Sequence, residues 1–90
     1  MDFTWDDSKN LANVAKHNLS FYKAQEAFFD KNRVILQDVK HSSAEKRYFC
    51  IGKTTNGSVA TVRFTKRNSQ IRIIGAGYWR EGKKIYEQHN

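Results

Sequence analysis

The sequence predicts one α+β domain over residues 1–90: two helices packed on an antiparallel sheet of about four strands, with a short N-terminal strand and a C-terminal helix. Three observations support this prediction. Apolar residues recur at helical spacing near the N-terminus, and they alternate with polar residues in the second half. Asn56-Gly57 separates two alternating runs, which is the strongest short-range hairpin signal. Finally, ninety residues are too few for two cores.

The N-terminal segment is expected to form the short strand at residues 2–5 and a first helix at 6–18. Asp6 and the polar residues after it offer acceptors for the first turn, and Asn18 suits the left-handed conformation that often ends a helix. Spacings of three and four residues predict one apolar helical face, formed by Leu11, Val14 and Ala15.

A second helix is expected at 20–30, with Ser20 as its N-cap. Its apolar stripe is formed by Phe21, Ala24, Ala27 and Phe28. Further strands are expected within 33–39, 45–55, 58–68 and 70–79, and a last helix within 80–90. Because no helix interrupts these strands, we expect an antiparallel meander with the helices against one face.

Positive charge is concentrated in the second half of the chain. The formal net charge is +7, and residues 46–90 hold ten Lys and Arg against two Asp and Glu. A basic half of this kind indicates a polyanionic partner: RNA, DNA or an acidic protein. The alternative is a basic surface that only keeps the protein soluble.

Cys50 is the one cysteine, so no disulfide is possible within the chain and a reducing compartment is expected. It lies in an apolar run, where a free cysteine usually behaves as a small buried hydrophobe. The acidic N-terminus lacks the apolar core of a signal peptide, and no run is long enough to span a membrane. We therefore expect a cytoplasmic protein without membrane contact.

Alternation within 58–67 separates two sets of side chains. One set, Ala60, Val62, Phe64 and Lys66, is expected to face the core; the other carries Arg63 and Arg67 in alternation with Thr61 and Thr65. Arg72 projects to the same side from the last strand, and Lys53 lies near the end of the strand at 45–55. Together they outline a phosphate-binding surface, although alternating Arg and Thr is also common on a plain solvated sheet face.

Two glycines, Gly75 and Gly77, interrupt the last strand, and glycine within a strand often marks a bulge or a close approach. We expect them to leave a groove beside the arginines. Tyr78 can stack on a base, whereas Trp79 more often seals a helix against a sheet.

Among the three histidines, His41 lies in a polar loop, where it can act as a general acid or base or simply remain exposed. No metal-binding spacing, glycine-rich phosphate loop or Ser-His-Asp order is present, so no metal and no cofactor are expected.

Three segments of the chain carry motifs of one known family. The first, at residues 3–30, holds Trp5, Asp6, Lys9, Asn13, Lys16, His17, Ser20, Phe21, Ala24 and Phe28. The second, at residues 38–54, holds Asp38, His41, Ser42, Glu45, Arg47, Ile51 and Gly52. The third is the run 71–87, which begins Ile-Arg-Ile-Ile. Together these segments resemble the BrnT family of type II toxin–antitoxin ribonucleases.

The resemblance implies a RelE-like fold, metal-independent cleavage of RNA that inhibits translation and growth, and neutralisation by a small BrnA-like antitoxin that alone contacts DNA. In that interpretation the residues that act on the scissile phosphate are Arg63, Arg72, Lys53 and His41. The residues that hold the rest of the RNA are Arg67, Arg80, Lys83 and Tyr78.

One segment departs from the family pattern. Where the family has Ser-Ala-Arg, this chain has Gly75-Ala76-Gly77, so a cation is missing. An alternative function is therefore a catalytically weakened relative that still binds an antitoxin or RNA.

Overall fold

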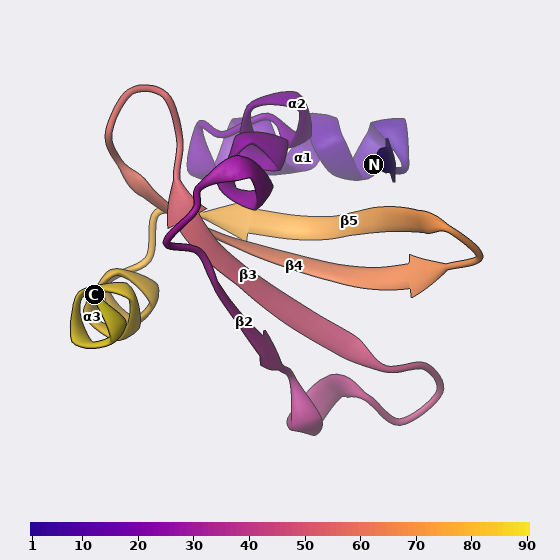
Figure 1. The fold of residues 1–90 in the computed structure, drawn as a ribbon. Helices are drawn as coiled ribbons and strands as arrows, with labels where there is room; N and C mark the ends of the chain where they lie inside the picture. The colour runs from indigo at the N-terminus through magenta and orange to yellow at the C-terminus, as the bar shows by residue number, and fades with distance from the viewer.

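Five strands form one mixed sheet in the computed structural model, which describes residues 1–90. Their order across the sheet is β1-β5-β4-β3-β2 (Figure 1). β1 runs parallel to β5, and the other neighbouring pairs are antiparallel. The strands are β1 (Asp2–Thr4), β2 (Val34–Gln37), β3 (Arg47–Lys53), β4 (Val59–Arg67) and β5 (Gln70–Gly77).

The predicted strands and the β3–β4 hairpin at Asn56-Gly57 are confirmed, but the sheet is not a four-stranded antiparallel one. The N-terminal strand joins it as a fifth strand, with Phe3 paired to Ile71 of β5. The Phe3 ring also packs edge-on against Phe28, with ring centroids 5.1 Å apart. Since this partner strand lies far along the chain, no local pattern in residues 2–5 indicates it.

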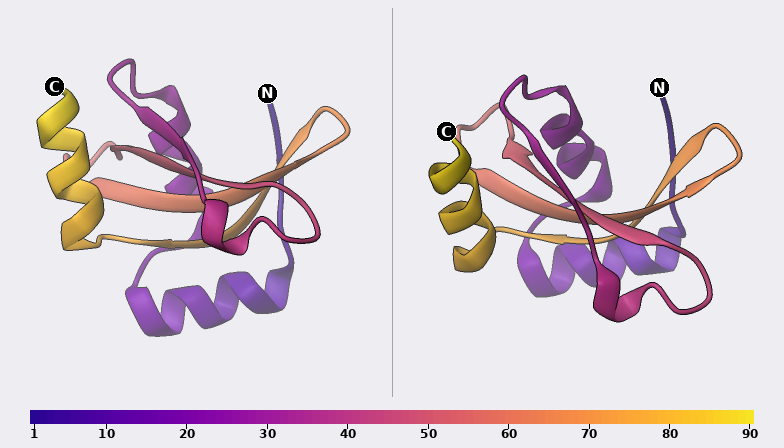
Figure 2. Two further views of the ribbon diagram at one scale, coloured as in Figure 1. Left: turned by 90° about the horizontal axis from the view of Figure 1, so that it is seen from below. Right: turned by 60° about the horizontal axis from the view of Figure 1, so that its bottom comes forward.

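Helices cover both faces of the sheet, which corrects the prediction that they lie against one. In Figures 1 and 2, α1, α2 and η1 lie on one side and α3 on the other. α3 packs across β3 and β4. No helix is long and apolar enough to cross a membrane. The helical segments are α1 (Asp7–His17), α2 (Phe21–Ala24), the 3₁₀ segments η1 (Gln25–Phe29) and η2 (Val39–His41), and α3 (Arg80–His89).

The main core lies between the sheet and the α1, α2 and η1 layer. The predicted inward set on β4 is confirmed for Ala60, Val62 and Phe64, which are buried. Lys66 instead extends over the Tyr48 ring, 5.4 Å from its centroid. The other buried residues of this core are Leu19, Phe21, Ala24, Ala27, Phe28, Cys50, Ile73 and Ala76.

α1 has the predicted ends but not a buried apolar face. The Asp6 side chain accepts hydrogen bonds from two first-turn N–H groups, and Asn18 adopts φ 52°. The apolar face points outward: Leu11 is 68% exposed, and no α1 residue is buried. Polar side chains hold the helix instead, since Asn10 accepts a hydrogen bond from the Phe21 N–H at 2.8 Å.

The second predicted helix is divided into two kinds of helix. Ser20 is its N-cap, as predicted, and accepts a hydrogen bond from the Lys23 N–H at 3.0 Å. After Ala24 the α-helix tightens into η1. A 3₁₀ helix has three residues per turn, so Ala24 and Ala27 align along one side, and both are fully buried.

Candidate functional site

The sheet face opposite the main core carries three arginines from neighbouring strands. Arg47 of β3 pairs with Thr65 of β4, which pairs with Arg72 of β5. Arg63 lies one row further along the same face of β4. The chain has three ion pairs, Lys23–Glu26, His41–Asp38 and Arg67–Glu45. None of them includes one of these three arginines.

This arginine face is not a plain solvated sheet surface. Thr61 and Thr65, which alternate with Arg63, are 5% and 1% exposed. The Thr65 hydroxyl donates a hydrogen bond to the Lys46 carbonyl at 2.8 Å. Burial of both threonines shows that the face is partly enclosed, and unpaired cations in such surroundings favour anion binding.

Because Gly75 has no side chain, the Arg63 guanidinium can lie against the backbone of β5. Arg63 and Gly75 are paired across β4 and β5, and a Cβ on Gly75 would lie only 3.1 Å from Nη2 and 3.2 Å from Nε of Arg63. The guanidinium therefore lies directly against the β5 backbone. Its Nε is buried and donates to no atom of the chain, so no internal acceptor competes for the Arg63 cation.

A bulge and an asparagine fix the backbone around Gly75. The register shifts between Arg63 and Phe64, which leaves Ile74 as the additional residue of β5. Next to the bulge, the Asn13 amide donates to the Ala76 carbonyl at 3.0 Å, and its oxygen accepts from the Ala76 N–H at 3.2 Å. Asn13 thus supplies the hydrogen bonds that another strand would make at this edge.

Gly77 is covered by the Trp79 ring in the same way. A Cβ on Gly77 would overlap the indole, so this side chain lies flat on the end of β5. The indole also makes an edge-to-face contact with His17 of α1, with ring centroids 5.4 Å apart. Both glycines therefore mark close approaches, one by Arg63 and one by Trp79, rather than empty space.

α3 stands on the arginine face at a close contact with β4. A Cβ on Gly82 would overlap the Thr61 hydroxyl, so no larger residue fits there without movement. The Thr61 Oγ1 is itself buried without a hydrogen-bond partner. This contact places α3 on the arginine face, which the alternation of side chains had predicted to be solvent-exposed.

Asp30 ties the other side of α3 to β3. Its carboxylate accepts hydrogen bonds from the Tyr86 hydroxyl at 2.6 Å, the Lys53 N–H at 2.8 Å and the Asn32 N–H at 2.9 Å. Burial raises the pKa of Asp30, but these hydrogen bonds outweigh it and hold the pKa below its usual 3.8.

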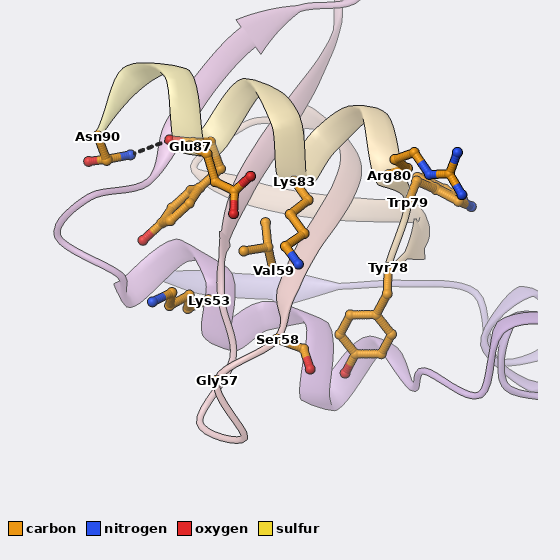
Figure 3. A pocket seen from close by; sticks show the side chains of 11 residues that line it. Lys53, Gly57, Ser58, Val59, Tyr78, Trp79, Arg80, Lys83, Glu87 and Asn90 are labelled. Carbon is orange, nitrogen blue, oxygen red and sulfur yellow. Dashed lines mark hydrogen bonds between the residues drawn. The ribbon is translucent and has the colours of Figure 1, made fainter.

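On one flank of α3, a hollow of about 610 Å³ opens toward the β3–β4 turn. In Figure 3 the side chains of Tyr78 and Lys83 extend into it, whereas Lys53 and Arg80 lie at its two rims. Three of the residues around this hollow are cations, and Glu87 is the only carboxylate. We call it the basic hollow.

On the other flank of α3 lies an apolar groove of about 380 Å³. Its apolar walls come from β2, β3, the α3 N-cap and α3 itself. The polar side chains that line it are Gln37, Thr61 and Glu81. The lining residues are Leu36, Gln37, Phe49, Ile51, Thr61, Trp79, Glu81, Gly82 and Ile85.

His41 and Arg67 lie at the far end of the sheet. His41 Nδ1 is 2.9 Å from Asp38 Oδ2, and His41 lines a hollow of about 230 Å³ together with Arg47. Arg67 Nη2 is 3.1 Å from Glu45 Oε1, and this hydrogen-bonded pair holds the pKa of Glu45 below its usual value.

The structure thus separates the predicted site residues into three groups. Arg63 and Arg72 share the arginine face. The other RNA-contact candidates Tyr78, Arg80 and Lys83 gather with Lys53 around the basic hollow, while His41 and Arg67 are at the opposite end. Lys53 lies four residues along β3 from the level of Arg63, about 13 Å in an extended strand.

Sequence reasoning missed the position of Arg47. The signal was present, since alternation places Arg47, Phe49, Ile51 and Lys53 on one face of β3. What could not be derived locally was the register that puts Arg47 in one row with Arg72.

Cys50 is buried and unpaired, as predicted for a small hydrophobe. Burial raises the pKa of its thiol to about 12, so the thiolate is scarce at neutral pH. No group of three or more His, Cys, Asp or Glu side chains is arranged to hold a metal ion.

Comparison with known proteins agrees with this architecture. The crystal structure of the Brucella abortus ribonuclease toxin BrnT, at 1.1 Å, superposes with a TM-score of 0.68 at 22% identity, over 88% of this chain and 96% of that one. No curated protein matches the sequence. Residues 5–82 match the family described as "Ribonuclease toxin, BrnT, of type II toxin-antitoxin system". The chain therefore belongs to the BrnT family of toxins.

Proposed function

We propose that this chain is an endoribonuclease of a type II toxin–antitoxin system, which cleaves RNA and so inhibits translation and growth. One observation carries the proposal: Arg47, Arg63 and Arg72 lie on the sheet face opposite the main core and none of them forms an ion pair, although Arg47 is near enough to Glu45 to help lower the pKa of that carboxyl. Three arginines on neighbouring strands attract the negatively charged phosphates of an RNA backbone. Membership of a family described as ribonuclease toxins supports the same assignment.

In the proposed mechanism, Arg63 and Arg72 hold the scissile phosphate, and the RNA's own 2′-hydroxyl attacks its phosphorus in line. The P–O5′ bond breaks, leaving a 2′,3′-cyclic phosphate on one product and a 5′-hydroxyl on the other. The arginines stabilise the charge that develops on the non-bridging oxygens. No metal takes part in this mechanism.

His41 is the better placed of the two candidates for proton transfer. Asp38 fixes the His41 ring through Nδ1, which leaves Nε2 free to exchange a proton with the RNA. Its hollow is shared with Arg47, in the same row as Arg72. Lys53 is assigned instead to the RNA backbone at the basic hollow.

Outside the cleavage point, Arg80 and Lys83 are proposed to bind flanking phosphates at the basic hollow, with Tyr78 stacking on a base. Arg67 adds an RNA contact only where a phosphate replaces Glu45 as its partner. The proposed flanking contacts therefore lie at the two ends of the arginine face, with the basic hollow at one end and Arg67 at the other.

The proposed partner is a cognate BrnA-like antitoxin, through which alone the complex contacts DNA. A type II system implies an antitoxin, and a net charge of +7 suits an acidic partner segment. The proposed setting is the cytoplasm, and the proposed wider fold relationship is to RelE-like toxins.

One observation favours a second function, a weakened relative that only binds RNA or antitoxin. The Trp79 ring occupies the space over Gly77, where the resemblance to the family pattern implies an arginine. A cation of the family pattern is therefore replaced by an aromatic surface.

Induced expression in bacteria distinguishes the two functions. Growth arrest with new RNA 5′ ends is expected for the natural sequence and not for Arg63→Ala, whereas Arg33→Ala, an exposed arginine next to the outer strand β2, should act like the natural sequence. Normal growth and intact RNA, with soluble folded protein, would favour the binding module.

A further inference from the structure

We propose that the apolar groove beside α3 holds one nucleobase of the RNA, and that Glu81 makes this site prefer guanine. The inference rests on the proposed function, because it names the substrate preference of the same face. A volume of about 380 Å³ lies within the range of small-molecule pockets, about 300–1,000 Å³.

The groove begins where the arginine face ends. Phe49, which lines the groove, is paired directly with Arg63 across β3 and β4. Side chains in such pairs have Cβ atoms about 4.5–5.5 Å apart. The Arg63 guanidinium lies over Gly75 of β5, about two strand spacings or ~10 Å from β3, so the base of a nucleotide adjoining a phosphate held there reaches Phe49 by extending across β4.

Two aromatic residues give the groove surfaces on which a base can stack, namely Phe49 and Trp79. Trp79 is held in place by two contacts, with the β5 backbone at Gly77 and with His17. A surface that is already ordered loses little freedom when a base stacks on it, and such stacking is worth a substantial part of single-strand affinity.

Glu81 is the charged residue of the groove, and it pairs with no cation of the chain. An ionised carboxylate only accepts hydrogen bonds. Guanine presents two adjacent donors on its Watson–Crick edge, N1–H and the N2 amino group, whereas cytosine and adenine present one amino group and uracil an N–H flanked by carbonyls. A bidentate contact to guanine is therefore the best match.

The test measures binding of nucleoside 3′-monophosphates to the purified chain by calorimetry, so that it does not depend on cleavage. Guanosine 3′-monophosphate is expected to bind about tenfold more tightly than the uridine compound, and Glu81→Gln should remove most of this preference. Asp7→Asn is the matched control, because Asp7 is an exposed carboxylate of α1, on the opposite face of the sheet from the groove. Phe49→Leu should weaken all four nucleotides several-fold.

Equal affinity for the four nucleotides, or a guanine preference that survives Glu81→Gln, would overturn the inference. So would nucleotide binding that is indifferent to Phe49→Leu while antitoxin binding is lost, which would assign the groove to the antitoxin. Failure of the proposed function is a separate result: guanosine 3′-monophosphate would bind selectively, and RNA would remain intact.

Discussion

Replacement of Gly82 by alanine tests how closely α3 is packed on the sheet. Helix propensity alone predicts stabilisation by about 1 kcal/mol, because glycine inside a helix is that much less favourable than alanine. The close contact between Gly82 of α3 and Thr61 of β4 predicts a loss of stability instead. The new Cβ would overlap the Thr61 hydroxyl and lie 3.2 Å from the Thr61 Cβ.

Rotation of Thr61 does not remove this conflict, because its Cβ stays within 3.2 Å of the new atom in every rotamer. Overpacking of this kind costs about 1–3 kcal/mol, and the severity of the overlap places it at the upper end. After the helix-propensity gain of about 1 kcal/mol, the free energy of unfolding of Gly82→Ala should be about 2 kcal/mol lower than that of the natural sequence.

Urea unfolding measures this difference, and a double-mutant cycle locates its cause. Thr61→Ala in the Gly82→Ala background removes the overlapping hydroxyl but keeps the Cβ contact, so it should recover only part of the lost stability. Gln88→Ala, an exposed change on α3, should alter it by less than about 0.5 kcal/mol. A Gly82→Ala protein more stable than the natural one would refute the close contact between α3 and β4.

Three further predictions concern stability and reactivity. Asn13→Ala leaves the Ala76 N–H and carbonyl without partners, so denaturant unfolding should show a loss of about 1–3 kcal/mol. The lowered pKa of Asp30 means that its stabilising effect is present above pH 3.8 and is lost as pH falls below it. Acid titration should therefore destabilise the natural protein more steeply than Asp30→Asn; parallel curves would count against the Asp30 hydrogen bonds. Cys50, with its pKa raised to about 12, should resist alkylation at pH 8 until the protein unfolds, and rapid native-state labelling would contradict its burial.

Local signals accounted for most elements of the fold. Alternation located the last three strands, Asn56-Gly57 located their hairpin, and Asp6, Asn18 and Ser20 act as helix caps where they were expected. Each of these features depends on residues within a few positions of one another. They were therefore visible in the sequence.

The features that were missed depend on distant partners. Asn13 holds α1 to the sheet through Ala76, which is 63 residues away. The apolar spacing within α1 therefore could not show that its Leu11 face is exposed. The side of the sheet taken by α3 depends on the fit of Gly82 to Thr61. Neither contact has a local signature.

The candidate site shows the same division. The glycines of β5 mark a bulge and two close approaches, but the groove expected beside the arginines is filled by the Arg63 guanidinium and the Trp79 ring. Which side chains lie there is decided by the strand register and by the path of the chain into α3. Alternation put Arg63 and Arg72 on one face. Only the strand pairing added Arg47.

Cleavage of a defined RNA by the purified protein in the presence of EDTA is the most direct test of the arginine face. The natural sequence and Arg33→Ala should both produce fragments ending in 2′,3′-cyclic phosphate. Arg63→Ala, folded by circular dichroism, should be slower by a factor of about 10²–10³, the usual effect of removing one group that stabilises transition-state charge. Equal rates for Arg63→Ala and the natural sequence would show that the three arginines are not the centre of the reaction.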